Sequence, residues 1–234
     1  MGQIIDTSAI VLKTFPYGET SLISRCFTKD KGKVSFIIKG ARSKKNLIAP
    51  YFQPLSFIQI IYNEKEKRDL QIVSKVHFIK IWLKISKSLK KMTLLQSILE
   101  ITDFSLEIND PHPELFESLI EVIEFYESGS INSNLVFWFY ESIVLAEIGF
   151  RIDLEDDDFE SRGYDSLNLK EEVQCRYILQ NLINKKFKKI SFEKILPREK
   201  KLISNYLYNQ LCYHIEGFDR LKSFKVAKNI LNDL

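Results

Sequence analysis

The sequence predicts an α+β protein in which a five-stranded β-barrel precedes an all-α helical domain. Two periodicities support this prediction. Between Ser8 and about Ser74, apolar residues occur in short runs, some of them alternating with polar residues, which is typical of strands. From Ile85 onward they recur every three or four residues, as on the buried face of a helix. The change of period therefore marks a change of architecture within one chain.

The change of period also predicts the domain boundary. With 234 residues, 45% of them hydrophobic, the chain can bury one good core or a small module beside a larger one. We expect a boundary between about Lys75 and Lys84, which assigns residues 1–80 to the barrel and 81–234 to the helical domain.

Short runs separated by turn residues predict the strands in order. A turn is expected at Phe15–Gly18 and another at Asp30–Lys33, and the charged stretch Asn63–Asp69 separates the last two runs. Five short antiparallel strands are too few for a two-sheet sandwich but match a small barrel such as the OB-fold. The expected runs are Ile10–Leu12, Leu22–Phe27, Val34–Ile38, Leu55–Tyr62 and Leu70–Val73.

Helical spacing predicts the elements of the second domain. The stretch Asn109–Pro113 should end one helix and begin the next, because proline is tolerated at a helix start and not inside it. The helix over 135–148 is apolar nearly all round, so we expect it at the centre of its domain, with Gly149 as its stop. The expected helices are 85–106, 113–128, 135–148, 169–184, 198–215 and 221–231, and an acidic surface loop covers 150–168.

The net charge of +3 conceals a strong partition along the chain. Residues 1–95 carry 18 Lys or Arg against 6 Asp or Glu, whereas residues 96–150 carry 11 acidic residues and no Lys or Arg. Residues 151–234 are nearly balanced, with 16 basic and 14 acidic residues. This division is what a polyanion-binding module joined to a protein-packing module would show, although ordinary surface charge is the simpler alternative.

A basic turn after the third strand is the main candidate for phosphate contacts. Gly40 and Ala41 let the backbone approach a phosphate, and Arg42 can bind it with two hydrogen bonds. Basic residues on neighbouring strands would extend the turn into one groove, although a solvated loop is the alternative. The predicted DNA-binding residues are Lys13, Arg25, Lys33, Lys39, Arg42, Lys44 and Lys45.

Aromatic residues interleave with this basic region, where they could stack on bases. Most must instead fill the core of so small a barrel. Tyr17 and Tyr51 are the best candidates for stacking because they are expected at turns.

Other chemistry is poorly supported. The acidic run between Asp153 and Glu160 invites a metal-dependent nuclease hypothesis, but no distant carboxylate motif or catalytic base accompanies it. The three cysteines Cys26, Cys175 and Cys212 are scattered, so neither a disulfide framework nor a zinc site is indicated. We therefore expect no metal, no cofactor and no enzymatic activity. A soluble cytoplasmic protein is expected, because no leader or apolar stretch suited to a membrane is found.

An ordered set of short motifs resembles the RecO family of bacterial recombination mediators. At the other end of the chain, residues 217–223 resemble that family's C-terminal signature. The N-terminal motifs are Ala9–Lys13, Tyr17–Thr20, Phe27–Thr28 with Gly32–Lys33, Lys39–Arg42 and Gln53–Leu55.

The resemblance implies a fold, a role and partners. It implies an N-terminal OB-fold, a helical domain, and a non-enzymatic role in DNA repair on single- and double-stranded DNA in the nucleoid. That role is to assist RecA loading on single strands coated by single-strand-binding protein (SSB), with RecR as partner, and to anneal strands. Many members carry a four-cysteine zinc module after the apolar helix. This chain has no cysteine in Phe150–Asn168, so no metal is expected.

The resemblance also implies that the acidic tail of SSB docks on the helical domain. Because residues 96–150 contain no Lys or Arg, the dock must take its cations from elsewhere, and we expect Arg220, Lys222 and Lys225. The alternative function is an OB-fold protein–protein adaptor that does not bind DNA directly.

Overall fold

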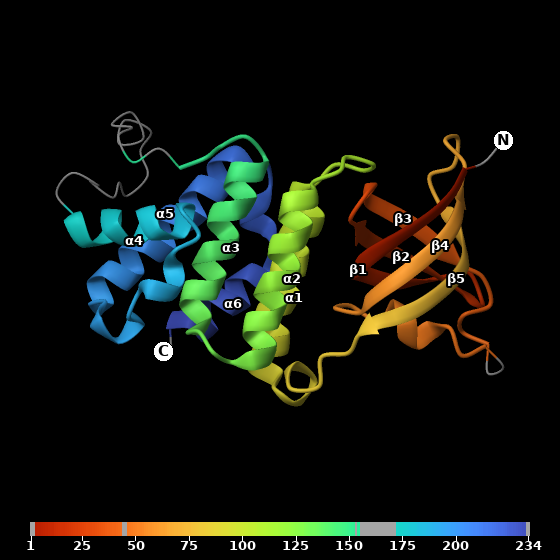
Figure 1. Ribbon diagram of the computed structural model, residues 1–234, viewed down its shortest axis with the longest axis horizontal. Helices are drawn as coiled ribbons and strands as arrows, with labels where there is room; N and C mark the ends of the chain where they lie inside the picture. The colour runs from red at the N-terminus through yellow and green to blue at the C-terminus, as the bar shows by residue number, and fades with distance from the viewer. Residues whose placement is uncertain (1–2, 44–45, 153, 155–171, 233–234) are drawn as a thin grey trace. The chain divides into compact units, whose positions relative to one another are not determined.

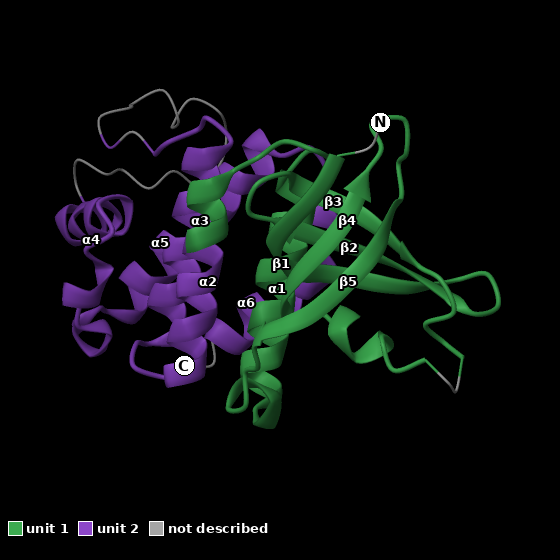
Figure 2. Ribbon diagram, turned by 45° about the vertical axis from the view of Figure 1, so that its right-hand side comes forward, with its two compact units in different colours: residues 1–117 green, residues 118–234 purple. Residues whose placement is uncertain are grey.

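The computed structural model describes residues 3–43, 46–152, 154 and 172–232. The chain divides into two compact units, residues 1–117 and residues 118–234 (Figure 2). The boundary falls within helix α2 (Pro113–Ser128). The first unit therefore contains the strands, helix α1 and the start of α2.

Within the described residues, five strands form a closed barrel in the order β1-β2-β3-β5-β4 (Figure 1). The pair β3–β5 is parallel and the other pairs are antiparallel. Closure satisfies the backbone groups that an open sheet would leave at its edges. The predicted class, an OB-fold barrel followed by helices, is confirmed. The strands are β1 (Gln3–Tyr17), β2 (Ser21–Thr28), β3 (Gly32–Ile38), β4 (Phe57–Glu64) and β5 (Gln71–Lys80).

Strand β1 makes closure possible because it is long enough to pair along both its sides. Its first half pairs with β4 and its second half with β2, and the register shifts between Val11 and Lys13. Such a bulge bends a strand and increases its twist, which a small barrel requires.

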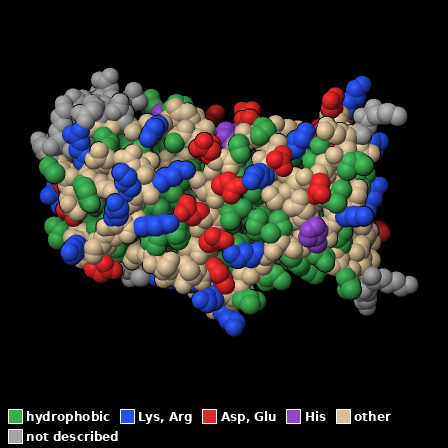
Figure 3. All heavy atoms as spheres, in the orientation of Figure 1, with side chains coloured by type: hydrophobic (Ala, Val, Ile, Leu, Met, Phe, Trp, Pro, Cys, Tyr) green, Lys and Arg blue, Asp and Glu red, His purple; other side chains and the backbone are tan. Residues whose placement is uncertain are grey.

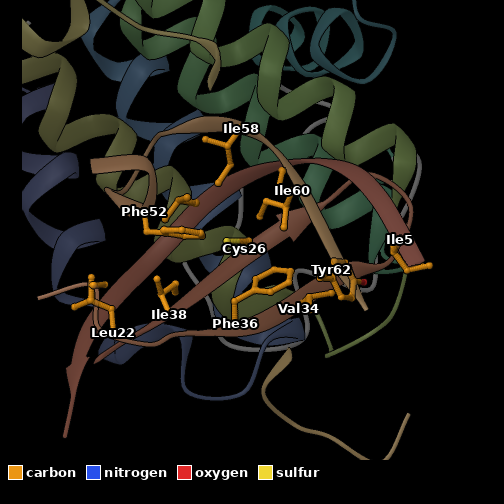
Figure 4. Packing of buried hydrophobic residues seen from close by; sticks show 13 residues of the cluster. Ile5, Leu22, Cys26, Val34, Phe36, Ile38, Phe52, Ile58, Ile60 and Tyr62 are labelled. Atoms are coloured by element: carbon orange, nitrogen blue, oxygen red, sulfur yellow. The ribbon is translucent and has the colours of Figure 1, made fainter. Parts of the chain in front are cut away.

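The barrel core consists largely of buried side chains from β1, β2, β3 and β4 (Figure 4), and Val73, Val76 and Phe78 of β5 pack against it. Phe36 and Tyr62 meet edge to face at its centre, with ring centroids 5.1 Å apart. The short 3₁₀ helix Ala49–Phe52 adds Phe52, which is fully buried. Figure 4 shows these side chains converging inside the strands.

Two predicted strand boundaries were wrong. Phe15–Gly18 is not a turn: β1 continues to Tyr17, and the chain reverses over Gly18–Thr20. Strand β5 also continues beyond Val73 to Lys80, because Val76 and Phe78 keep packing against the barrel core. His77 lies between these two residues, so the apolar–polar alternation typical of a strand continues beyond Val73 in the sequence.

Helix α1 (Leu89–Ser105) begins later than the predicted start at Ile85. A 3₁₀ turn, η2 (Ile85–Lys87), comes first, and the Ser88 side chain then accepts a hydrogen bond from the Lys91 amide and caps the helix. Leu89 and Met92, which the spacing placed on the apolar stripe, are 82% and 43% exposed.

The second unit is helical, and α3 (Ser133–Glu147) has the continuous burial that its composition predicts. Gly149 follows it with a φ of 90°. Among the described residues, no helix is long and apolar enough to cross a membrane. The remaining helices are α4 (Val173–Ile183), α5 (Pro197–His214) and α6 (Lys222–Asn232), with 3₁₀ turns at Phe187–Lys189, Phe192–Lys194 and Phe218–Arg220.

Candidate nucleic-acid interface

Helix α1 packs against β1 and, together with the start of α2, contacts Arg25 and Phe27 of β2 and Lys33 of β3. Arg25 on β2 donates two hydrogen bonds from Nη1 to the Asp103 carboxylate of α1, at 2.9 and 2.7 Å. Beside them Phe27 packs edge to face on Phe116, with ring centroids 5.4 Å apart. The strand 2–3 face, which commonly binds oligonucleotides in OB-folds, is therefore occupied from within the chain.

Lys33 lies under the same cover. Its Nζ donates to the Asp103 backbone oxygen at 2.5 Å and lies 3.8 Å from the Asp103 carboxylate. Burial lowers the pKa of Lys33, and the negative charge of Asp103 opposes that shift. Of the predicted DNA-binding residues, Arg25 and Lys33 are thus already engaged by Asp103.

A basic corner is exposed at the end of β1, where two turns are bonded together. The Arg42 amide donates to the Thr20 carbonyl at 2.8 Å, and Arg42 Nη1 donates to the Gly18 carbonyl at 3.3 Å. Lys39 and Arg42 are exposed, and Tyr17, at the end of β1, is 51% exposed. The structure therefore brings three predicted contact residues to one corner.

The β4–β5 loop carries further cations at the other end of the barrel, where Glu64 pairs with Gln3 at the start of β1 and accepts from Lys31 of the β2–β3 turn. Gln71 holds the loop by donating from Nε2 to the carbonyls of Lys65 (3.0 Å) and Arg68 (2.9 Å). Lys65, Lys67 and Arg68 are exposed on it, as is Lys75 on β5.

The parallel pairing of β3 and β5 relates Lys75 to the basic corner. Phe36 pairs with Gln71 and Ile37 with Ile72, so the turn after β3 leaves the barrel beside the part of β5 that carries Lys75. A parallel contact between distant strands is not visible in the sequence. The sequence therefore did not indicate that Lys75 lies near the basic turn after β3.

The other predicted residues are placed as follows. Lys13 is exposed on β1, directly opposite Arg25 in the register. Lys44 and Lys45 lie outside the described residues. The Tyr51 ring already stacks on Phe78, with centroids 4.5 Å apart, which leaves Tyr17 as the more accessible candidate for base stacking.

The predicted partner-binding residues Arg220, Lys222 and Lys225 are all exposed, on the turn before α6 and on α6 itself. None of them lines the pocket of about 490 Å³ formed by α3, α5 and α6. Lys200, Lys201 and Ser204 of α5 do line it.

This pocket is rich in hydrogen-bond donors. Trp138 Nε1 is buried with no partner among the described residues, and Trp138 lines the pocket. The Asn205 Oδ1 atom accepts from Lys228 Nζ at 2.9 Å, which turns the Asn205 amide nitrogen into the available donor. Two lysines and several neutral donors suit an anionic group.

In the described part of the chain, no group of three or more His, Cys, Asp or Glu could hold a metal ion. The acidic run considered above as a nuclease site lies, apart from Leu154, outside the described residues, as does most of the segment 150–168, where no metal is expected.

The barrel and helices together define a protein of the OB-fold and helical-domain class. Two family models match the chain in the same order. The family described as Recombination protein O N terminal matches residues 1–82, and Recombination protein O C terminal matches residues 86–159. The chain belongs to the RecO family of DNA repair proteins.

Curated relatives agree with this assignment. A DNA repair protein RecO of Salinibacter ruber is 32% identical over 62% of this chain and 56% of the relative. That of Flavobacterium psychrophilum is 26% identical over 97% of this chain and 99% of the relative. The DNA repair protein RecO of Chloroherpeton thalassium is 26% identical over 65% of this chain and 59% of the relative. The chain thus aligns with a little over half of the first and third relatives, and with nearly the whole of the second.

Proposed function

We propose that this chain is a non-enzymatic recombination mediator that binds single- and double-stranded DNA through its barrel. The single observation that carries the proposal is the exposed basic corner at the end of β1, where Arg42 is bonded to the β1–β2 turn beside Lys39 and Tyr17. Membership of a DNA repair family supports it. Its place of action would be the cytoplasm, on the nucleoid.

Phosphate contacts would supply most of the affinity. The contacting residues would be exposed cations, with Tyr17 stacking on a base where a strand is single. Because Arg25 and Lys33 are engaged by Asp103, we place the phosphate contacts on the other predicted cations and extend them onto β5. This set comprises Lys13, Lys39, Arg42, Lys44, Lys45 and Lys75.

The salt dependence of DNA affinity tests the proposal. If Z cations meet phosphates, log K should fall with log[salt] at roughly −0.7Z to −0.9Z. Changing Lys39, Arg42 and Lys75 to alanine should flatten this slope by about two to three. A triple alanine variant at Lys186, Lys189 and Lys194 of the second unit removes the same charge and should retain the slope. Equal slopes in both variants would refute the placement.

The predicted phosphate contacts of the turn after β3 are tested in the same assay by changing Arg42, Lys44 and Lys45 to alanine, which should also flatten the slope. If the unchanged chain fails to shift DNA at either low or moderate salt, the protein–protein adaptor becomes the better function.

The helical unit would bind the acidic, carboxylate-ended tail of SSB, so that RecA can be loaded with RecR as partner. Two sets of cations are available for the tail. Arg220, Lys222 and Lys225 are exposed at the start of α6, and Lys200 and Lys201 line the donor-rich pocket.

Charge reversal separates these two docks. Binding of a synthetic SSB tail peptide is measured by fluorescence anisotropy for a variant with Glu at positions 220, 222 and 225, and for a second variant with Glu at 200 and 201. We expect the first variant to lose at least about tenfold in affinity. Loss in the second variant alone would move the dock to the pocket, and loss in neither would refute binding at both.

A further inference from the structure

We propose that the first unit carries a docking site for an acidic peptide segment that presents a large aliphatic or aromatic side chain. The site is a pocket of about 240 Å³ where β5 leaves the barrel and α1 begins. It uses different residues from the basic corner and from the pocket on α5, so it does not depend on the proposed DNA binding. Its lining is mostly apolar and includes Phe78, Ile81, Trp82, Ile85 and Met92.

A hydrogen bond and ring packing hold the wall of this pocket in place. Trp82 is 6% exposed and forms part of the wall, because its Nε1 donates to the Leu55 carbonyl at 3.1 Å. Its ring is parallel to that of Phe57, with centroids 6.4 Å apart. Leu55 itself has a φ of 72°, a left-handed conformation that costs a residue with a Cβ about 1–2 kcal/mol. Local strain is thus retained at the wall of this pocket.

Apolar side chains are exposed in the segment that lines the pocket and in its sequence neighbours. Ile81 is 62% exposed and Leu83 64%, and Leu89 and Met92 at the start of α1 are exposed as well. Four large apolar side chains are thus exposed within residues 81–92, and two of them, Ile81 and Met92, line the pocket, which indicates an interaction surface. The rim is aliphatic, whereas nucleotide bases stack on exposed aromatic rings. The rim therefore favours a peptide over DNA.

The charge around the patch is entirely positive in the sequence. Residues 70–99 contain six lysines and no Asp or Glu. Lys80 Nζ lies 4.7 Å from the Trp82 ring centroid, and Figure 3 shows basic and hydrophobic side chains side by side where the η2–α1 turn protrudes. An acidic partner is the complement of this surface.

The start of α1 contradicts the usual charge preference of helices. The positive end of the helix dipole favours Asp or Glu in the first turn, yet α1 has none there and carries Lys90 and Lys91 instead. This arrangement costs stability in the free chain, and an acidic segment bound across it would reverse the cost. Departures from local rules of this kind are expected at functional surfaces.

The volume of the pocket favours a peptide side chain over a small molecule as its occupant. Pockets for drug-sized ligands begin at roughly 300 Å³. A pocket of about 240 Å³ instead accommodates one or two apolar side chains, while the flanking lysines contact the acidic residues on either side.

A phage-displayed library of random peptides tests the site on the full chain, with counter-selection on an Ile81→Ser/Met92→Ser variant. Both positions are exposed, so the variant should fold. We expect enriched sequences with Asp or Glu flanking Leu, Ile, Met or Phe. Enrichment of neutral or basic sequences, or no enrichment over the variant, would overturn the proposal.

An enriched peptide is then measured by fluorescence anisotropy. The Lys87→Glu/Lys90→Glu variant should weaken binding at least about tenfold, and a rise from roughly 50 to 200 mM salt should weaken binding to the unchanged chain. The matched control is Lys186→Glu/Lys189→Glu, which should bind as the unchanged chain does. If the Ile81→Ser/Met92→Ser variant instead loses DNA affinity or abolishes self-association, the occupant is DNA or a second copy and the proposal fails.

Discussion

Gly32, at the start of β3, is constrained both by its own backbone conformation and by a distant segment of the chain. Its φ is 63°, and an added Cβ would overlap the backbone of Asp110, in the segment between α1 and α2. The residue therefore meets two demands at once, a left-handed turn after β2 and close passage of a distant segment. Only the first demand is local.

Changing Gly32 to alanine should lower the free energy of unfolding by about 2–4 kcal/mol, because conformational strain adds to a backbone clash. Gly18→Ala is the matched control: Gly18 also has a positive φ, of 56°, but nothing lies within 4 Å of its added Cβ. It should cost about 1–2 kcal/mol. Urea unfolding measures both. Equal losses would show that Asp110 can move aside.

Glu141 is a buried carboxyl in α3 that should make stability depend on pH. Burial raises its pKa from 4.5 to about 8, and the charge of Lys228 opposes that shift. Between these pH values the folded chain holds a proton that the unfolded chain releases, so stability falls as pH rises from about 4.5 to 8.

We expect the slope from this group to approach about 1 kcal/mol per pH unit, and Glu141→Gln to remove it, because the amide stays neutral. The measurement is the urea unfolding free energy between about pH 5 and 8. A parallel decline in the variant and the unchanged chain would place the pH dependence elsewhere.

Among the elements, helix α1 has the largest effect on what the barrel can bind. It packs against β1 and engages Arg25 of β2 and Lys33 of β3 through Asp103. The basic turn after β3 was predictable, because its glycine and cations adjoin in the sequence. Lys75 of β5 was not, because only the parallel β3–β5 contact relates it to that turn.

Asp103→Asn should loosen the attachment of α1 to the barrel. The amide keeps the shape of the carboxylate but removes the nearest negative charge from Lys33, which is 7% exposed. We expect a loss of about 1–3 kcal/mol in the free energy of unfolding, measured by urea titration. Glu117→Gln breaks the exposed pair with Lys29 and should leave stability unchanged. An unaltered Asp103→Asn protein would mean that apolar contacts alone hold α1.

For the whole molecule, the division into two compact units predicts that unfolding is not a single step. Each unit buries its own core, so the calorimetric enthalpy should exceed the van't Hoff enthalpy. Gly32→Ala should lower only the transition of the first unit, and Glu141→Gln should change only that of the second. One transition with equal enthalpies, shifted by both variants, would show that the units unfold together.

The order of strands and helices, the two structural classes and the partition of charge were determined by the sequence itself. Hydrophobic period and composition are local properties of the sequence, so they can be recognised without knowing which distant residues are in contact. The tertiary structure alone decided which cations are available, because the cover over Arg25 and Lys33 comes from a helix some 70 residues away. Alternation identifies the outer face of a strand, but it does not tell whether water, DNA or another part of the chain meets that face.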